Sequence, residues 1–404
     1  MNTILNEKID DYRNEIIEFS NKLFNTPELG YKEFNTKKII KEELEKYGIH
    51  VEKEYLETGF QVSLGNGKPH IGLIAELDAI PTLNHPNANK IDNAAHSCGH
   101  NTQVAIMTYA IIVLNDLEFN GKVTLFYTPA EEYTDLDYRN KLIKENKIKY
   151  IGGKTNMLEM GLFEGIDCFI HLHGMGGKYE FGYNSSLAGF IYKKITFIGK
   201  ASHAGVSPNE GINALNIFTL FNSGLGMLRE TLVEGNMTRI HGIITKGGDS
   251  INSVPEKVVY ECYIRSLNYE ALNDISEKLD TLAIHCGKSL GGDAKIETKE
   301  GYKPLVPNKH LSDVIYNNIL HFSSEEKIIK NERSIASGDV GDISMHYPIT
   351  QFGYSGFKGS FHGKDFMIED YDKGLIQPTK IVVMSVIDLI NNKEILQGVL
   401  DEKN

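Results

Sequence analysis

The sequence predicts an α/β protein with a mixed sheet, into which a second module of β-α-β-β-α-β order is inserted. Strand-like runs lie at residues 70–77, 122–127 and 167–173. An apolar stretch at 103–114 between the first two runs is long enough for a buried helix. A strand, a helix and two further strands are the order expected of a sheet with helices on its faces.

The inserted module is predicted from six further elements. In chain order they are a strand at 189–198, a helix at 211–233, strands at 238–245 and 254–265, a helix at 268–290 and a strand at 294–299. This order is typical of a ferredoxin-like module. The α/β pattern resumes after about Tyr302. We therefore predict a discontinuous catalytic domain of residues 1–187 and 303–404, and an inserted domain of residues 188–302.

The ends of the chain are predicted to be helical. Apolar residues recur at spacings of three and four, which indicates an amphipathic first helix: Ile9, Tyr12, Ile16, Phe19 and Leu23. A second helix at 35–47 ends at Gly48, a residue favoured just after a helix. An apolar helix at 378–391 closes the chain.

The composition excludes several classes of partner. The 404 residues carry a formal charge of −12, so neither nucleic acid nor an anionic membrane is expected as a partner. We expect no signal or transit peptide in the polar, mixed-charge start, and the longest apolar run, 104–114, is too short to span a bilayer. Four cysteines do not form a disulfide framework, so we predict a cytoplasmic protein in which Cys98 is available as a thiolate.

A metal site is predicted from Cys98, His100 and the pair Glu131-Glu132. A thiolate and an imidazole two residues apart can bind one cation from a single turn. The acidic pair follows the strand at 122–127, where open α/β sheets place their ligands. One carboxylate can then bind metal while its neighbour acts as a base toward water. The alternative is a buried structural cysteine beside an unrelated histidine, with two solvated acids.

Three further histidines are candidates. His171 and His173 end the strand at 167–173 on one face, and His173 lies nearer the edge. His203 falls in the first turn of the inserted module, and His362 lies in a glycine-rich segment where backbone can approach a ligand closely. Taken singly, each histidine is also explained as a core or loop residue.

Motifs along nearly the whole chain support these candidates together. They occupy residues 25–33, 75–81, 96–101, 128–132, 202–205, 247–255, 336–342 and 361–362. In this order they resemble the zinc-dependent aminoacylase and glutamate carboxypeptidase family. The resemblance is to its amidohydrolase branch, which includes hippurate, auxin-conjugate and aminobenzoyl-glutamate hydrolases. It implies a metallopeptidase catalytic domain with a lid and dimerisation domain.

The resemblance implies a two-metal site in the larger domain. Cys98 is similar to the bridging ligand, a role that an aspartate has in other branches. His100 and His173 would complete the ligands of one metal ion, and Glu132 and His362 those of the other.

The resemblance also implies roles for residues that bind no metal. Glu131 would be the general base, and Asp78 would orient a ligand. His203 would reach the partner subunit's site across a dimer and stabilise the oxyanion. Asn252 and Arg265 would bind the substrate, and Arg265 would bind the carboxylate of the substrate.

Some positions depart from the family pattern. Glu76 stands where the wider family has a metal-binding histidine, and Asn101 rather than aspartate follows His100. Asn101 and the segment 339–342 favour the aminobenzoyl-glutamate and dipeptide hydrolases over hippurate hydrolase.

We therefore predict a metal-dependent amidohydrolase that cleaves the amide bond of N-acyl or aminoacyl amino acids with a metal-activated water. Its cofactors would be two divalent ions, zinc or manganese. Its partners would be a small-molecule N-acyl amino acid or dipeptide and a second copy of the chain, bound through the lid domain. A dipeptidase or short-peptide peptidase is the alternative. A catalytically silent relative is the third hypothesis, against which the retention of Glu131 and His203 argues.

Overall fold

A computed structural model describes residues 2–402, which form two compact units. Unit 1 comprises Met1–Ser186, Val306–Glu332 and Asp342–Asn404, and unit 2 comprises Leu187–Leu305 and Arg333–Gly341. The second segment of unit 2 falls within the range that we predicted for the catalytic domain. It groups with unit 2 because Arg265 Nη1 donates to the carbonyl of Ile335 and to Ser337 Oγ, at 3.1 and 3.0 Å.

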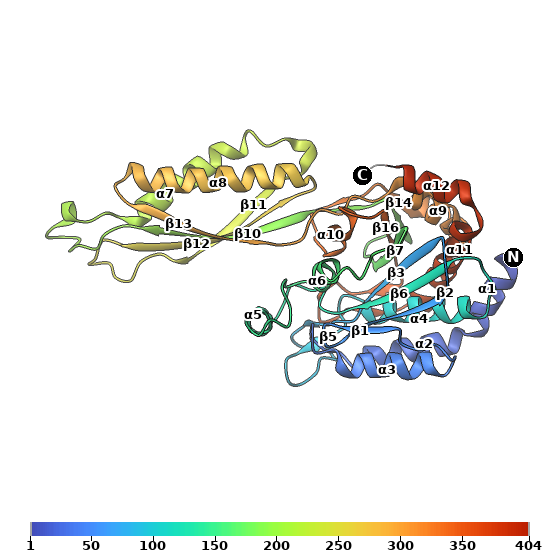
Figure 1. Cartoon of the computed structure of the whole chain (residues 1–404). Coiled ribbons are helices and arrows are strands. Elements are labelled where there is room, and N and C mark those ends of the chain that lie inside the picture. Colours follow the sequence, from blue (N-terminus) through green and yellow to red (C-terminus); the bar gives the residue numbers. More distant parts are fainter. Residues whose placement is uncertain (1, 403–404) are drawn as a thin grey trace. The chain divides into compact units, whose positions relative to one another are not determined.

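Unit 1 is built on an eight-stranded mixed sheet of order β1-β2-β6-β3-β7-β16-β8-β14 (Figure 1). Its strands are β1 (Lys53–Tyr55), β2 (Gly59–Gly65), β6 (Lys122–Thr128), β3 (His70–Glu76), β7 (Cys168–Gly174), β16 (Ile349–Tyr354), β8 (Phe181–Tyr183) and β14 (Ile328–Lys330). The four central strands β6, β3, β7 and β16 run parallel, and β1, β2 and β8 pair antiparallel with neighbours. The predicted α/β fold with a mixed sheet is confirmed.

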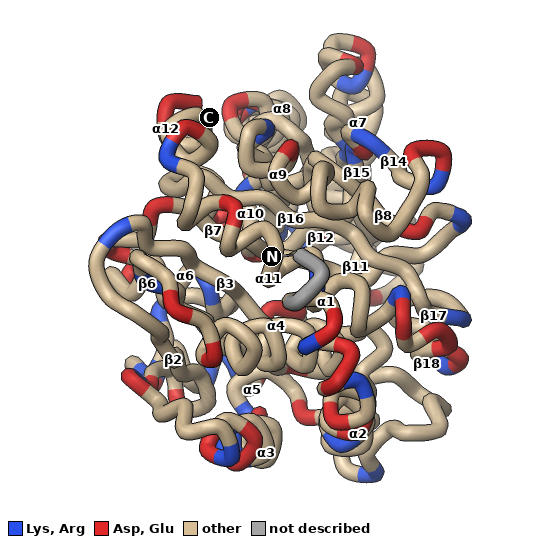
Figure 2. Tube along the Cα trace, turned by 90° about the vertical axis from the view of Figure 1, so that its right-hand side faces the viewer, with Lys and Arg blue, Asp and Glu red and all other residues tan. Residues whose placement is uncertain are grey.

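Helix α4 (His100–Asn115) forms the centre of unit 1, because fifteen of its residues are buried and none is charged. It packs against the sheet, with α2 (Arg13–Phe24) and α3 (Phe34–Glu45) outside it (Figure 1). Charged residues gather on α2 and α3, while α4 carries none (Figure 2). The segment Asp372–Asn391 is long and apolar enough to cross a membrane, but 78% of its most apolar window is buried, as in a core helix.

Further helices and short strands complete the chain, and α11 (Gln377–Asn391) among them belongs to the core of unit 1. The helices are α1 (Asn2–Asp11), α5 (Leu136–Lys144), α6 (Gly153–Glu159), α9 (Lys309–Ile319), α10 (Val340–Ser344), α11 (Gln377–Asn391) and α12 (Lys393–Asp401). The strands are β4 (Ile80–Pro81), β5 (Ala94–Ala95), β9 (Ser186–Leu187), β15 (Arg333–Ser334), β17 (Phe357–Lys358) and β18 (Met367–Ile368).

Two details at the start of the chain test the helix prediction. The predicted first helix is two helices, because the backbone leaves helical geometry at Tyr12, where ψ is 5°. The next helix, α3, ends at Glu45, two residues before the predicted end, and the turn that follows closes at Gly48 as expected. Gly48 has a φ of 69°, and Ile49 N–H donates to the carbonyl of Leu44.

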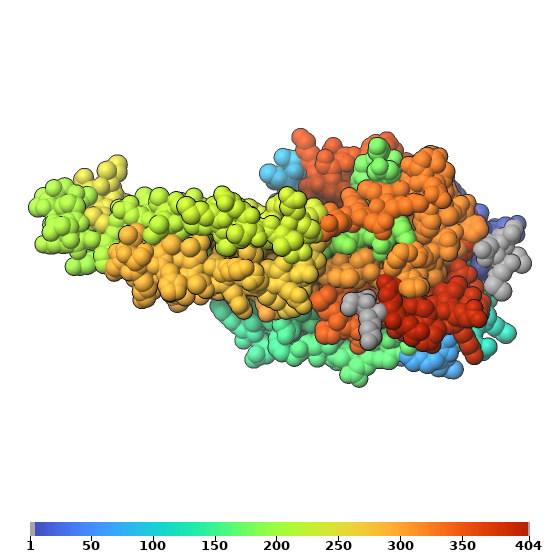
Figure 3. Space-filling view, turned by 90° about the horizontal axis from the view of Figure 1, so that it is seen from above, coloured from blue at the N-terminus to red at the C-terminus, as the bar shows by residue number. Residues whose placement is uncertain are grey.

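Unit 2 contains β10 (Gly189–Ile198), α7 (Ala214–Arg229), β11 (Arg239–Lys246), β12 (Lys257–Ser266), α8 (Tyr269–Ser289) and β13 (Asp293–Glu300). The strands form an antiparallel sheet of order β11-β12-β10-β13, and the six elements follow the predicted β-α-β-β-α-β order. Asn213 and Asn268 cap the two helices by accepting backbone N–H groups. The helices pack side by side (Figure 3).

Candidate metal centre

The candidate ligands of unit 1 gather where its parallel strands end. Asp78 follows β3, and Glu131 and Glu132 follow β6. His173 is the next-to-last residue of β7. Since β6, β3 and β7 are parallel neighbours, their carboxyl ends meet at one edge of the sheet. This is the edge at which open α/β sheets bind ligands.

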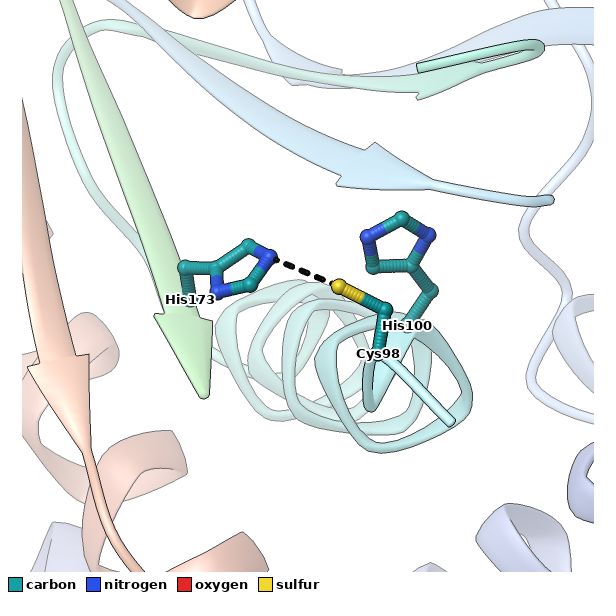
Figure 4. A group of neighbouring side chains, drawn as sticks. All are labelled: Cys98, His100 and His173. Carbon is teal, nitrogen blue, oxygen red and sulfur yellow. Dashed lines mark hydrogen bonds between the residues drawn. The ribbon is translucent and has the colours of Figure 1, made fainter. Parts of the chain in front are cut away.

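Gly99 brings Cys98 and His100 to this edge. Its φ of 85° lies in the left-handed region, which lets the chain turn sharply between the two side chains and enter α4. Cys98 Sγ lies 3.4 Å from Nε2 of His173, which reaches in from β7 (Figure 4). One ligand atom from each of Cys98, His100 and His173 lies within 4.8 Å of the others.

A second group shares the same thiol. Ligand atoms of Cys98, Glu132 and His362 also lie within 4.8 Å of one another, with His362 Nε2 3.5 Å from Glu132 Oε1. His362 has a φ of 62°, and its N–H donates to the carbonyl of Ser97 at 2.8 Å. This hydrogen bond joins the loop of His362 to the segment that carries Cys98. Cys98 belongs to both groups.

Hydrogen bonds orient the two buried imidazoles. His100 Nδ1 lies 2.8 Å from the carbonyl oxygen of Asp78, and His173 Nδ1 lies 2.8 Å from that of Gly174. A carbonyl only accepts, so each Nδ1 carries the proton and each Nε2 keeps a lone pair. Such an outer partner is what a metal-binding histidine requires.

The donor set fits divalent ions. Among the described residues, His100 Nε2 and Glu132 Oε1 are buried without a hydrogen-bond partner. Unpaired buried polar atoms are rare and need a reason. Thiolate, imidazole and carboxylate donors that converge on two positions suit two divalent cations.

Protonation of Cys98 is linked to such binding. Burial, followed by the charge of Glu132, raises the pKa of the Cys98 thiol well above its ordinary value. A thiolate forms here only with a compensating cation, so metal uptake is expected to release a proton.

Asp78 contacts one residue of each group, His100 and Glu132. It is fully buried, and its Oδ2 accepts the N–H of Glu132 at 3.0 Å while its carbonyl holds His100. Arg139 Nη2 lies 3.9 Å from the same Oδ2. The orienting role of Asp78 stays a prediction, and these are the contacts through which it would act.

Glu131 points to the same centre. It is 8% exposed, and its Oε2 lies 3.9 Å from His100 Nε2. Burial, followed by the charges of Glu76 and Glu132, raises the pKa of Glu131 well above its ordinary value. A carboxylate with a raised pKa accepts a proton more readily, as a general base must.

The other predicted site residues lie in unit 2. His203 is exposed, and its Nδ1 accepts the N–H groups of Gly205 and Val206 at 3.2 and 3.1 Å. The ring proton is therefore on Nε2, which is set up as a donor. Asn252 is exposed in the adjoining turn, where its carbonyl accepts the N–H of Ala204 at 3.0 Å.

Arg265 of unit 2 is half-buried, and its guanidinium already has several contacts. Nη1 is shared between Ile335 and Ser337, and the group lies over the ring of Phe190 at 5.6 Å.

Several residues near the centre were not predicted to act there. Glu76 was noted only as a departure from the family pattern, while Lys154 and Arg139 were not singled out. Lys154 is fully buried at 2.6 Å from Glu76, and Arg139 is fully buried near Asp78. Both lie in short helices whose polar sequences resemble exposed surface. The glycine pair before Lys154 was the only local signal of a close packing contact.

Comparison with known proteins places the chain. The model of "Peptidase family M20/M25/M40" matches residues 72–381. The chain is 24% identical to the N-acetyl-L-cysteine deacetylase of Bacillus subtilis over 94% of this chain and 89% of that protein. It is 25% identical to the Xaa-Arg dipeptidase of Mus musculus over 98% of this chain and 90% of that protein.

A solved structure with the same fold is the YXEP protein of Bacillus subtilis, described as a dinuclear metal binding peptidase from the M20 family. It has a TM-score of 0.74 and 18% identity, with 95% of this chain and 99% of that chain covered. The family match spans most of the chain, and it confirms the predicted family and hydrolase class. The chain belongs to peptidase family M20/M25/M40.

Proposed function

We propose that the protein hydrolyses the amide bond of N-acyl amino acids at a centre of two divalent ions. Its ligands would be Cys98 between His100 and His173 on one side and Glu132 and His362 on the other. The observation that carries this proposal is the pair of three-residue groups that share Cys98, with the Glu131 carboxylate beside them. The deacetylase relative supports an acylated amino acid as substrate.

When bound, the ions would lower the pKa of a water molecule and polarise the substrate carbonyl. Glu131 would take the proton from this water as its oxygen attacks the carbonyl carbon. The carbon–nitrogen bond then breaks, and Glu131 delivers the proton to the leaving amine. Asp78 holds His100 and the backbone of Glu132 in place throughout.

His203 would supply the oxyanion donor. The Nε2–H fixed by its local hydrogen bonds supports this role, and one such donor contributes about 3–4 kcal/mol to the transition state. Following the family resemblance, we propose that His203 acts in the site of a partner subunit, in a dimer formed through unit 2.

Following the same resemblance, we propose that Asn252, in the turn beside His203, contacts the substrate. For Arg265 the resemblance is the only support, because its Nη1 is already engaged.

The metal is proposed to be zinc or manganese, since thiolate and imidazole favour zinc and carboxylate suits either ion. A reducing, cytoplasmic setting would keep Cys98 available as a ligand. The absence of disulfides among the described cysteines is consistent with that setting.

A dipeptidase is the second candidate, and the relative that supports it is the Xaa-Arg dipeptidase, which matches 98% of the chain. The two candidates share one chemistry and differ in whether the group beyond the carbonyl is a plain acyl group or an aminoacyl group.

The test is a substrate panel on protein reconstituted separately with zinc and manganese, with N-acyl amino acids and dipeptides in parallel. Glu131→Gln is the matched control. It should keep both ions and lose activity by about 100- to 10,000-fold, because only the base is removed. No turnover of any substrate by wild-type protein with two bound ions would refute the proposal. Near-normal turnover by Glu131→Gln would remove Glu131 as the base.

A further inference from the structure

Glu76 is the centre of a buried polar network behind the metal ligands. Its Oε1 lies 2.6 Å from Lys154 Nζ and 3.1 Å from His171 Nε2, and its Oε2 accepts from Gln103 Nε2 at 3.0 Å. The same Oε2 lies 3.2 Å from His100 Nε2. These four neighbours and Glu76 are each at most 1% exposed.

Glu76 therefore completes a third group of possible metal ligands. Ligand atoms of Glu76, His100 and Glu131 lie within 4.8 Å of one another, and all three residues are buried. Two carboxylates and an imidazole suit a divalent ion. An ion held at this position by the two carboxylates would draw on His100 and so weaken the Cys98 group, which keeps Cys98 and His173, and it would bind the proposed base.

Lys154 places a positive charge inside this third group. It lies in α6, and its side chain is 0% exposed to solvent, so the ammonium contacts the polar network. Gly153 allows the approach. A Cβ there would lie 1.8 Å from the carbonyl oxygen of Pro129, and its N–H donates to the carbonyl of Ala130 at 3.2 Å. The start of α6 thus packs on the backbone that leads into Glu131.

We propose that Lys154 is a positioning residue whose ammonium serves as a resident counter-cation to Glu76. It keeps the group of Glu76, His100 and Glu131 from binding metal. His100 is then left to the Cys98 group, and Glu131 is left to accept a proton. This inference rests on the proposed two-metal function and adds to it the reason why a third set of ligands takes up no ion.

The physical argument is one of charge. A carboxylate in contact with a buried ammonium is already neutralised, and a divalent ion brought beside that ammonium would be repelled in a region of low dielectric. Without Lys154, the buried carboxylate of Glu76 would lose its nearest positive charge, and a divalent ion would be the most effective replacement.

The first experiment replaces Lys154 by Met, which keeps the length of the side chain and removes its charge. After reconstitution with excess zinc and desalting, metal is counted by mass spectrometry. We expect Lys154→Met to bind about one further ion per chain compared with wild type. An ion count equal to that of wild type overturns the proposal.

Lys193→Met is the matched control. Lys193 is also 0% exposed, and its Nζ lies 2.6 Å from Asp280 in unit 2. The variant therefore removes an equally buried ammonium at a place with no candidate metal ligands among the described residues. We expect the wild-type ion count, and a rise equal to that of Lys154→Met would also overturn the proposal.

A second measurement holds even if Lys154→Met does not fold. Glu76→Gln removes the negative charge that lies 2.6 Å from the Lys154 ammonium and keeps that ammonium near His100, so metal should bind about tenfold or more weakly in competition with a chelating indicator. The double variant Glu76→Gln/Lys154→Met removes both charges and should bind metal as tightly as wild type. A double variant as weak as Glu76→Gln overturns the proposal. Failure of the wild type to take up metal would instead overturn the proposed function.

Discussion

Arg139 of α5 offers the sharpest test of how the metal centre is held. The side chain is fully buried, and its Nη1 donates to the carbonyls of Ala130 and Ile151 at 3.4 and 3.2 Å. Its Nη2 lies 3.9 Å from Asp78 Oδ2, and the guanidinium lies 5.6 Å from the ring centre of Tyr31. Replacement by Met would keep much of the apolar volume and remove the charge and the donors.

The expected cost follows from these contacts. Removing one partner of a buried charge pair costs about 3–5 kcal/mol, because the other charge stays buried. Two carbonyls would also lose a charged donor, at about 1.5–3 kcal/mol for a good bond. Both bonds are long, however, and Nε and Nη2 find no hydrogen-bond partner among residues 2–402, so burial of this guanidinium is itself costly. We therefore expect the lower end of the range, about 3 kcal/mol.

The loss should reach the metal ligands through Ala130. This residue has a φ of 57°, a left-handed conformation that costs a residue with a Cβ about 1–2 kcal/mol. The N–H of Ala130 donates to Glu33 Oε1 at 2.9 Å, and the carbonyl of Ala130 accepts from Arg139 Nη1 and from the N–H of Gly153. Without Arg139 the turn before Glu131 and Glu132 can relax, so metal affinity should also fall.

The assay is hydrogen exchange of the α4 amides in metal-free protein, which reports the free energy of opening of unit 1 without requiring a two-state transition of the whole chain. Arg13→Met is the control, because Arg13 pairs with Asp372 on the surface, with side chains 38% and 53% exposed. It should change stability by less than about 1 kcal/mol. If Arg139→Met were no more destabilising than this control, the buried guanidinium would not hold the centre in place.

Three further predictions concern pH, the oxyanion donor and the packing of α6. Burial, followed by the charge of Asp78, raises the pKa of Glu33 from 4.5 to about 8, so its stabilising contribution is complete below pH 4.5 and is lost as the pH rises to about 8. Relative to wild type, Glu33→Gln should therefore gain thermal stability as the pH rises from about 5 to about 8.5. A difference in melting temperature between the two proteins that stays constant over this range would contradict the raised pKa of Glu33. His203→Ala should keep its metal and lose about 100- to 1,000-fold in kcat, whereas an unchanged rate would remove His203 from the mechanism. Gly153→Ala should lower the melting temperature because its Cβ would meet the carbonyl of Pro129, while Gly226→Ala in α7, with nothing within 4 Å, should raise it slightly; equal shifts would contradict the packing argument.

The fold was predictable where the pattern is local. β10 has the predicted bounds of 189–198, and β3 and β6 end within a residue of those predicted, because buried strands leave an apolar run between turn residues. The break at Tyr12 was missed because apolar residues keep helical spacing across it, so periodicity alone carries no sign of the interruption.

The candidate ligands were predictable for a related reason. Cys98, His100, Glu132 and His173 lie at the end of a recognisable strand or helix, so their place at the sheet edge follows once the strands are known. His362 lies in a loop, and only the family resemblance joined it to the other four. The supporting residues were not predictable in this way. Arg139 lies in Leu136–Lys144, a helix that carries two lysines and reads as solvent-exposed. Its burial results from contacts with Tyr31 and Ala130, which are distant in sequence from one another.

Two left-handed residues fix the backbone beside the proposed metal ligands. Ala130 and His362 both have positive φ although neither is glycine; Ala130 directly precedes the pair Glu131-Glu132, and His362 is itself a proposed ligand. Their N–H groups are held by Glu33 and by the carbonyl of Ser97. Each strained turn is thus fixed by a segment outside it, and such strain persists only where the surroundings enforce it. The strain of the two turns that carry Glu132 and His362 is therefore balanced by contacts with Glu33 and Ser97, which form as the chain folds.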